Sequence, residues 1–432
     1  MFRRGEKQAK SGMPQRLRLR RPAQPPAACL RRMEMRREKK QREKKESHAR
    51  FFSSNHRLAP LFETSSTLTG YEVDTFPAHR WNAALPTMKK YNVGIIGYGW
   101  AATAHIEAIN KTTQGQVTAI YSSRKLDDAE LSAKHGSKIK SYQSIDAMLA
   151  DPSIHVVDIT SYPSQHRDQA IAAANAKKHI ILEKPMANSL QEVREITAAA
   201  KSNGVQGCVC FECRFSNQFT VTKALIDEGL LGSLHYGEVD YYHGIGPWYG
   251  QFRWNTGKKD GGSALLTAGC HALDALLMMM GSEVESVSSF STRSSSEIFK
   301  PYEYDTSSTT IIRFKNGAVG KSAAIVDCLQ PYYFHTHLCG SQGSLLDDKF
   351  HSMKLHTDKH AWSKLSMKML DSGDVSDHPY QSQFQAFFDA LDAGKPMPLT
   401  SFEESQKSFE VIFAADKSAE QGGRPVKISE LA

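Results

Sequence analysis

The segment from Tyr91 to Ile109, which reads YNVGIIGYGWAATAHIEAI, constrains the fold of this chain more than any other. Its apolar run lacks polar alternation, as expected of a parallel strand covered on both faces, and a helical pattern begins directly after a Gly-Tyr-Gly turn. In this G-x-G-x-x-A arrangement, Gly97 allows the tight turn, Gly99 lets the backbone approach a pyrophosphate, and Ala102 lets the helix pack closely on the strand. The free N–H groups at the helix start favour phosphates. The residues expected to contact a dinucleotide here are Gly97, Tyr98, Gly99, Trp100, Ala101 and Ala102.

The end of the second expected strand, QVTAIYSS, indicates which dinucleotide is bound. NAD sites usually place a carboxylate here for the ribose 2′-hydroxyl. This strand instead continues into YSSRK (121–125), and the first carboxylate is that of Asp127. Serine hydroxyls and a guanidinium suit a 2′-phosphate, which an arginine can pair in bidentate fashion. We therefore predict that Ser122, Ser123 and Arg124 bind NADP, with NAD or a merely solvated basic turn as the alternatives.

Strands and helices continue to alternate, which predicts a doubly wound parallel sheet in a dinucleotide-binding domain over 88–210. Ligands of such sheets bind beyond the carboxyl ends of the strands. Two of these ends, in 159–166 and 182–187, carry polar side chains typical of a ligand site. Lys184 would extend into the ligand crevice, where partial desolvation and a nearby cationic nicotinamide would favour the neutral amine of a general base. A surface lysine is the alternative. The further cofactor contacts expected at these two ends are Ser161, Pro163, His166, Glu183 and Lys184.

Three segments, VGIIGYGWAATAH, LEKPMA and GGSALLTAGCHALDALLMMMG, resemble in order and spacing the glucose-fructose oxidoreductase / inositol dehydrogenase / MocA superfamily. The resemblance covers 88–432. It implies an α/β fold in which an N-terminal Rossmann domain precedes a C-terminal α+β domain, residues 211–432, with an open, largely antiparallel sheet that carries the substrate face and often an oligomer interface. It also implies an NAD(P)-dependent dehydrogenase or reductase of sugars, polyols or related carbonyl compounds.

By position, the resemblance gives catalytic roles to Lys184 and His271. Many members have an aspartate four residues before this histidine, where the chain has Thr267. Helical spacing would put Thr267 and His271 on one face. A threonine can only hydrogen-bond, so Thr267 is expected to help position the substrate, and the choice between Lys184 and His271 as the base stays open. Asp274 could orient His271 or have a structural role.

An aromatic, glycine-rich loop precedes this histidine helix. Its large side chains could stack on the apolar face of a sugar, or they could be core residues that pin the loop. Arg214 resembles the family's segment at the border between cofactor and substrate. The expected substrate contacts are Arg214, Trp248, Tyr249 and Trp254.

No metal site is predicted. Cys208, Cys210 and Cys213 cluster, but no second ligand pair follows at zinc spacing. His335 and His337 alternate along one expected strand and so share a face, but the sequence does not place a third ligand. The seven cysteines of the chain are an odd number without paired spacing, which favours a reducing compartment and hence the cytoplasm.

Basic charge is concentrated in residues 1–87, which carry 20 of the 54 Lys and Arg and 8 of the 46 Asp and Glu. The remaining residues are net acidic, although the whole chain is +8. We expect this extension to be disordered or a lone charged helix, and we favour an over-extended start, with a nucleic-acid or anionic-surface arm and a targeting peptide as alternatives. No apolar run approaches about 18 residues, so no membrane span is expected.

These patterns predict a soluble, NADP-preferring oxidoreductase that moves a hydride between nicotinamide and a carbinol carbon of a sugar or polyol, and that forms a homo-oligomer. Nucleic acid is not an expected partner of residues 88–432. The alternatives are a redox-neutral, glycosidase-type enzyme that holds NAD(P), and a nucleotide-binding sensor or scaffold without activity.

Overall fold

Six parallel strands form the first sheet of the protein, in a computed structural model that describes residues 91–371 and 378–431. The strands are β1 (Tyr91–Ile96), β2 (Gly115–Tyr121), β3 (Lys140–Tyr142), β4 (Val156–Ile159), β5 (His179–Leu182) and β6 (Gly207–Val209). Their order is β3-β2-β1-β4-β5-β6, and all neighbours are parallel. This order confirms the predicted doubly wound sheet. The predictions for residues 1–87 lie outside the described residues.

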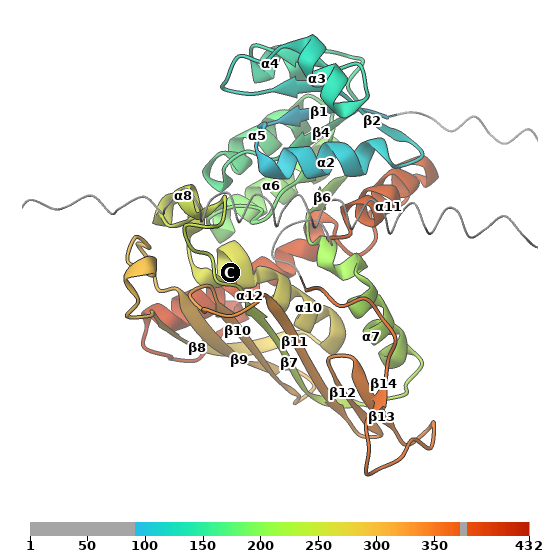
Figure 1. Cartoon of the computed structure of the whole chain (residues 1–432), viewed down its shortest axis with the longest axis vertical. Coiled ribbons are helices and arrows are strands. Elements are labelled where there is room, and N and C mark those ends of the chain that lie inside the picture. The colour runs from blue at the N-terminus through green and yellow to red at the C-terminus, as the bar shows by residue number, and fades with distance from the viewer. Residues whose placement is uncertain (1–90, 372–377, 432) are drawn as a thin grey trace, which may run out of the picture. The chain divides into compact units, whose positions relative to one another are not determined.

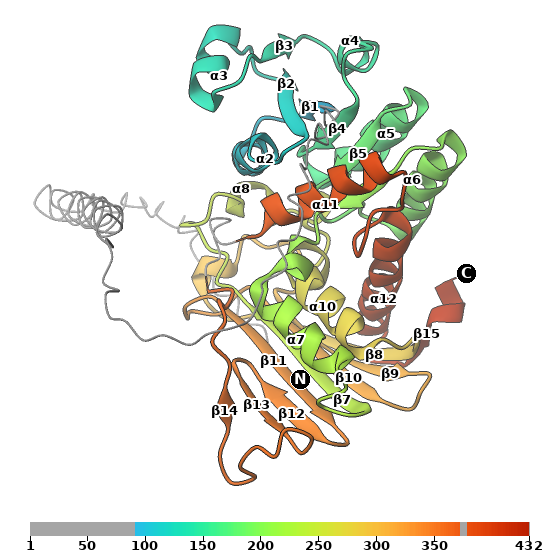
Figure 2. The same ribbon diagram turned by 90° about the vertical axis from the view of Figure 1, so that its right-hand side faces the viewer.

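Helices connect these strands and cover both faces of the sheet, as Figure 2 shows. They are α2 (Trp100–Asn110), α3 (Asp128–His135), α4 (Ile145–Leu149), α5 (Pro163–Asn175) and α6 (Leu190–Asn203). Their ends follow local signals. The hydroxyl of Ser189 accepts from the backbone N–H of Glu192 at the start of α6, and Gly204 ends this helix in the left-handed conformation.

The second sheet has nine strands and is mostly antiparallel. The strands are β7 (Leu234–Tyr242), β8 (Val284–Thr292), β9 (Ser307–Phe314), β10 (Val319–Ile325), β11 (Tyr333–Gly340), β12 (Gly343–Leu346), β13 (Lys349–Ser352), β14 (Ser363–Lys364) and β15 (Val426–Lys427). Their order is β14-β13-β12-β11-β7-β10-β9-β8-β15, and only the pair β7 and β10 is parallel among these described strands. The predicted open, largely antiparallel sheet is thereby confirmed.

Helices cover one face of this second sheet (Figures 1 and 2). They include α7 (Asn217–Asp227), α10 (Cys270–Met280) and α12 (Phe402–Glu420), and the short helical turns nearby are η1 (Glu212–Phe215), α8 (Phe252–Asn255), α9 (Lys258–Gly261) and η2 (Leu265–Gly269). On β7, Val239 and Tyr241 are buried in the core cluster on the helix side, so Glu238 points to the opposite face. Within the described residues, the helical stretch Lys258–Met280 is the one long and apolar enough to cross a membrane. Of its most apolar window, 83% is buried inside the protein, as expected of a core helix.

The helix α11 (Tyr380–Ala393) packs on the first sheet, although its sequence lies near the C-terminus. Its buried rings Phe384, Phe387 and Phe388 share one core cluster with Val93 of β1 and Ile106 of α2. The C-terminal part of the chain therefore completes the core on one side of the first sheet.

Candidate functional site

The turn from β1 to α2 has the geometry of a phosphate-binding turn. Gly97 has a φ of +97°, and a Cβ there would lie 2.9 Å from the backbone nitrogen of Ser161, in the loop after β4. At Gly99, by contrast, no atom lies within 4 Å of a Cβ built on its backbone. No side chain of the described residues caps the start of α2, so its first N–H groups remain available to an anion. This space and these donors fit a pyrophosphate at Gly99.

Cationic side chains gather beside this turn at the end of β2. The guanidinium of Arg124 donates to the carbonyl oxygen of Tyr98, and the Tyr98 hydroxyl accepts from Nζ of Lys134 at 3.0 Å. The carboxylate of Asp127 accepts from a backbone N–H at the start of α3. It is therefore engaged as a helix cap, and Arg124 is left as the charged group nearest the turn.

Most of the predicted cofactor contacts meet at one edge of the parallel sheet, because the carboxyl ends of its strands lie together. They are Gly97, Tyr98, Gly99, Trp100, Ala101 and Ala102 after β1, Ser122, Ser123 and Arg124 after β2, Ser161 and Pro163 after β4, and Glu183 and Lys184 after β5. His166 differs, since it is buried with Nδ1 at 2.8 Å from the carbonyl oxygen of Pro185 and Nε2 at 3.2 Å from that of Ser161. We interpret His166 as a structural residue that holds these two loops together.

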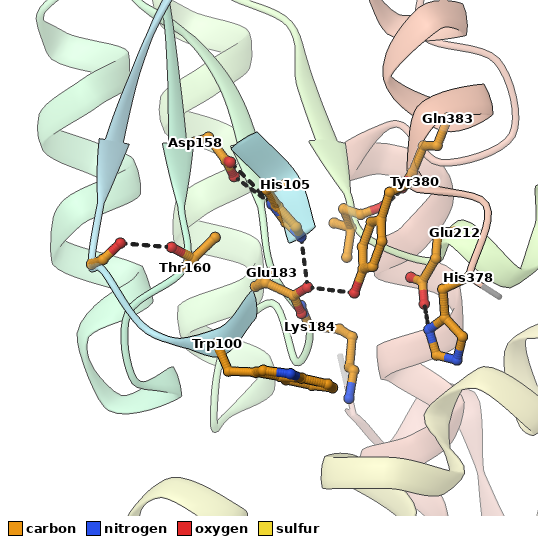
Figure 3. Close-up of polar contacts among 12 residues, drawn as sticks. Trp100, His105, Asp158, Thr160, Glu183, Lys184, Glu212, His378, Tyr380 and Gln383 are labelled. Carbon is orange, nitrogen blue, oxygen red and sulfur yellow. Dashed lines mark hydrogen bonds and ion pairs between the residues drawn. The ribbon is translucent and has the colours of Figure 1, made fainter. Parts of the chain in front are cut away.

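Four polar side chains form a buried network behind this edge (Figure 3). Nδ1 of His105 lies 3.0 Å from Oδ2 of Asp158, and its Nε2 lies 3.0 Å from Oε1 of Glu183. The Tyr380 hydroxyl of α11 donates to the same Glu183 oxygen at 3.0 Å. Burial by itself lowers the pKa of His105, but Asp158 and Glu183 outweigh it and raise that pKa to about 10. The network fixes Glu183 and thereby positions Lys184, the next residue in the chain.

Lys184 enters a small pocket between the two sheets. Its Nζ donates to the carbonyl oxygen of Thr267 at 3.1 Å. Burial lowers the pKa of Lys184, but negative charge at Cys270, Glu183 and Glu212 outweighs burial and raises it. Burial lifts the pKa of the Cys270 thiol to about 12, so the two carboxylates provide this charge at neutral pH. The protein's own charges therefore favour the ammonium form and act against the predicted neutral amine. The pocket lining includes Trp100, Lys184, Glu212, Tyr249, Gln251, Thr267, His271 and Tyr380.

His271, at the start of α10, is buried in the same pocket. Its Nε2 lies 3.9 Å from Oε1 of Glu212, which in turn lies 2.8 Å from Nδ1 of His378. Nδ1 of His271 has no hydrogen-bond partner among the described residues. Burial, together with the positive charges of Lys184 and His378, lowers the pKa of His271 well below 6.5. A neutral imidazole with an unused nitrogen can accept a proton from a ligand in this pocket.

Glu212 is the candidate that the sequence analysis missed. It lies in η1 directly after β6, is completely buried, and its Oε2 has no hydrogen-bond partner among the described residues. Thr267, which occupies the position of the common aspartate, brings a carbonyl oxygen to Lys184 and no carboxylate. The carboxylate beside His271 therefore comes from another element. The available signal was a glutamate within the apolar segment CVCFEC, which was considered above only for its cysteines.

Arg214 is not free to bind a substrate. Its Nε and Nη2 donate to the carboxylate of Asp274 at 2.7 and 2.6 Å, and its Nη1 donates to the carbonyl oxygen of Leu399. Asp274 also accepts from the Ser408 hydroxyl of α12 at 2.6 Å. The predicted substrate contact through Arg214 is therefore corrected to a structural ion pair. Asp274 takes the structural role rather than that of orienting His271.

The aromatic loop residues divide between the two sides of the pocket. Tyr249 lines both the small pocket and a neighbouring cavity of about 610 Å³. Trp248 also lines this cavity, with Nε1 donating to the carbonyl oxygen of Gly244 at 2.8 Å, and it is 60% exposed. The Trp254 ring lies 5.8 Å from that of Tyr162, in the loop after β4. Trp248 and Tyr249 thus stay candidates for the substrate wall, whereas Trp254 lines neither cavity.

Most strands of the two sheets lie in regions of the chain that match known protein families. Residues 91–211 match the model of an oxidoreductase family with an NAD-binding Rossmann fold, and residues 219–346 match the Gfo/Idh/MocA C-terminal domain. Myo-inositol 2-dehydrogenase of Thermotoga maritima is 26% identical over 340 residues, which cover 78% of this chain and 99% of that protein. An uncharacterized oxidoreductase of Synechocystis sp. is 34% identical over 196 residues, 44% of this chain and 51% of that protein. The latter match thus spans about half of that relative.

Solved structures agree on the fold. The levoglucosan dehydrogenase in complex with NADH and levoglucosan superimposes with a TM-score of 0.69 at 24% sequence identity. The aligned residues cover 78% of this chain and 99% of that one.

Proposed function

The chain belongs to the Gfo/Idh/MocA family of NAD(P)-dependent oxidoreductases, and from this premise we propose that it transfers a hydride between NADP(H) and a carbinol carbon of a sugar or polyol. One observation carries the proposal. The glycine turn that fits a pyrophosphate lies at the same sheet edge as the pocket in which Lys184 and His271 meet. A dinucleotide bound along this edge would supply the hydride acceptor, and the residues of the pocket would supply proton transfer and orientation.

The charge states of Lys184 and His271 support different catalytic roles for the two residues. Because its pKa is raised, Lys184 is an ammonium that can donate a hydrogen bond to the substrate oxygen and stabilise negative charge developing there. Because its pKa is depressed, His271 is neutral and can accept the hydroxyl proton. Glu212, at 3.9 Å, would then stabilise the imidazolium that forms. In this proposal His271 is the base, and Thr267 positions Lys184 through its carbonyl oxygen.

The preference for NADP rests on the end of β2. Arg124 lies against the turn at Tyr98, Ser122 and Ser123 offer hydroxyls beside it, and the carboxylate of Asp127 is occupied as a helix cap. A 2′-phosphate would find a guanidinium there, whereas a ribose 2′-hydroxyl would find no free carboxylate from this residue. The described cysteines are all unpaired, which supports a reducing compartment, and we further propose a cytoplasmic homo-oligomer.

A titration with NADPH and NADH tests the cofactor assignment. We expect tighter binding of NADPH, followed by nicotinamide fluorescence. We also expect Arg124→Ala to weaken NADPH binding by about ten- to a hundredfold, the worth of a charge-assisted pair, while NADH changes little. Lys125→Ala is the matched control, since it removes a neighbouring charge. Equal losses for both cofactors in the Arg124 variant would contradict the NADP assignment.

Hydride transfer is then tested with a panel of inositols and monosaccharides at saturating cofactor. We expect His271→Gln to lower kcat by about a hundred- to ten-thousandfold for whichever substrate reacts, with cofactor affinity unchanged. An active wild type with an equally active His271→Gln variant would remove His271 as the base. A wild type that binds NADPH but oxidises or reduces none of these compounds would contradict the proposed activity and favour a nucleotide-binding sensor or scaffold.

A further inference from the structure

Three clusters in the described residues bring His, Cys and carboxylate ligand atoms within 4.8 Å of one another. Two are buried and belong to the network and pocket already described. The third consists of Glu238, His335 and His337, which we call the sheet-face cluster, and it is independent of the proposed function. It lies on the face of the nine-stranded sheet opposite the helices, on the adjacent strands β7 and β11.

The strand register explains how the three ligands meet. β11 and β7 are antiparallel, and His337 pairs directly with Glu238. His335 is two residues before His337 and therefore points to the same face. The alternation of the two histidines along one strand is visible in the sequence, but their third ligand is not, because the partner strand comes almost a hundred residues earlier in the chain. The register supplies it.

The ligand atoms of the cluster all lie within 4.8 Å of one another, and one pair approaches the separation found around a bound ion. Nε2 of His335 lies 3.9 Å from Oε2 of Glu238. Two ligands held at about 2.1 Å from one tetrahedral zinc ion are about 3.4 Å apart. A contraction of roughly half an ångström would bring these atoms to that separation, which a side-chain adjustment provides.

A second layer of contacts orients His335 toward the cluster. Its Nδ1 lies 3.3 Å from Oδ1 of Asp347, and the same carboxylate accepts from the Tyr333 hydroxyl at 2.7 Å and from the backbone N–H of Thr336 at 2.9 Å. A carboxylate at one imidazole nitrogen fixes the ring and leaves the other nitrogen to a metal. Here the nitrogen that remains, Nε2, faces Glu238.

The charges around the cluster also favour a divalent cation. Glu238, Asp240 and Asp347 are three carboxylates, and Lys321 is the lysine that pairs with two of them, through Oε1 of Glu238 and Oδ2 of Asp240. With neutral imidazoles the group has an excess of two negative charges. Oε2 of Glu238 receives only the Tyr236 hydroxyl, at 3.1 Å, among the hydrogen bonds described, and can turn toward an ion.

We propose that Glu238, His335 and His337 form a zinc site on the open face of the second sheet, with the fourth position open to water. Two imidazoles and one carboxylate are a ligand set that zinc uses. Such an ion would link β7 to β11 on the face that no described helix covers.

Zinc binding by the full chain tests this proposal. The EDTA-treated, desalted protein is titrated with zinc against a chromophoric chelator, in a Cys339→Ser background because this thiol lies 3.7 Å from His337 and could bind zinc by itself. We expect His337→Gln and His335→Gln each to lose one zinc per chain or to weaken its binding at least tenfold. His235→Gln is the matched control, since His235 is an exposed histidine on the same strand β7 that is not part of the cluster.

Unchanged zinc stoichiometry and affinity in both histidine variants would overturn the proposal. Cobalt(II) binding to the chain that keeps both histidines gives a second readout, which does not depend on the folding of a histidine variant. We expect the intense visible band of a four-coordinate ion. If only the weak band of the six-coordinate aqueous ion is observed, the proposal is also overturned.

Discussion

At the scale of single residues, His105 is the cation that allows two carboxylates to be buried beside the pocket. It lies between Asp158 and Glu183 and is itself completely buried. The raised pKa of about 10 means that the folded state binds this proton more tightly than the unfolded chain does. Its stabilising contribution is therefore complete below the ordinary value of 6.5 and is lost as the pH rises toward about 10.

We predict that His105→Gln lowers the free energy of unfolding by about 3–5 kcal/mol at pH 7, because it leaves two buried carboxylates without their cation. Urea denaturation measures the loss, which should shrink as the pH is raised toward 10. The double variant His105→Gln, Asp158→Asn should recover part of the lost free energy of unfolding, since one of the two unpaired buried carboxylates is then removed. A loss below about 1 kcal/mol would show that the network is not an ion pair.

At the scale of elements, helix α12 carries a half-buried carboxylate, that of Asp416, which lies against Ser263. Oδ2 of Asp416 accepts from the Ser263 hydroxyl at 2.9 Å. Burial raises the pKa of Asp416 from 3.8 to about 7, and the nearby Glu420 acts in the same direction. The folded state therefore holds this proton more tightly, so the contribution to stability is complete below about 3.8 and is lost as the pH rises through about 7.

We predict that Asp416→Asn flattens the dependence of stability on pH. The variant should match the wild type near pH 4 and exceed it by about 1–2 kcal/mol at pH 8, where the wild type must bury a charge. Denaturant curves at both pH values give the comparison. Glu403→Gln changes an exposed carboxylate at the other end of the same helix and serves as the control. Parallel curves for wild type and Asp416→Asn would rule out a proton held by this carboxyl.

At the scale of the whole molecule, the C-terminal helices join the two sheets through contacts that leave no room for a side chain. A Cβ at Gly207 of β6 would lie 2.3 Å from the ring of Phe402, at the start of α12. A Cβ at Gly115 of β2 would lie 2.4 Å from the ring of Phe388 in α11. Both rings are buried, so neither can move aside without repacking the core.

We predict that Gly207→Ala destabilises the protein by about 1–3 kcal/mol, the usual cost of overpacking a core. Gly99→Ala is the contrasting variant, because its Cβ would meet nothing within 4 Å and its φ of −105° suits any residue. It should keep wild-type stability and weaken NADPH binding. Thermal unfolding and NADPH titration of both proteins separate the two effects, and a Gly207→Ala variant as stable as the wild type would refute the close packing.

Most of the first domain could be predicted from sequence because its signals are local. The buried strand, the Gly97-Tyr98-Gly99 turn and the helix after it lie within twenty residues, and strand-helix alternation then leads to one sheet topology. The positions of Lys184 and His271 in one pocket followed from the family resemblance and agree with the structure. Their protonation states did not follow. That of Lys184 depends partly on Glu212, and that of His271 on burial and on the charges of Lys184 and His378, which other elements bring close.

The sequence by itself determined the order of the elements, the dinucleotide-type turn and the residues that end the strands, since backbone geometry and hydrophobic period act over a few neighbours. Only the tertiary structure decided which distant groups meet. Glu212 rather than residue 267 brings a carboxylate to His271, Asp274 pairs with Arg214, and Glu238 joins His335 and His337. Such contacts depend on strand register and core packing between segments far apart in the chain, which no local pattern records.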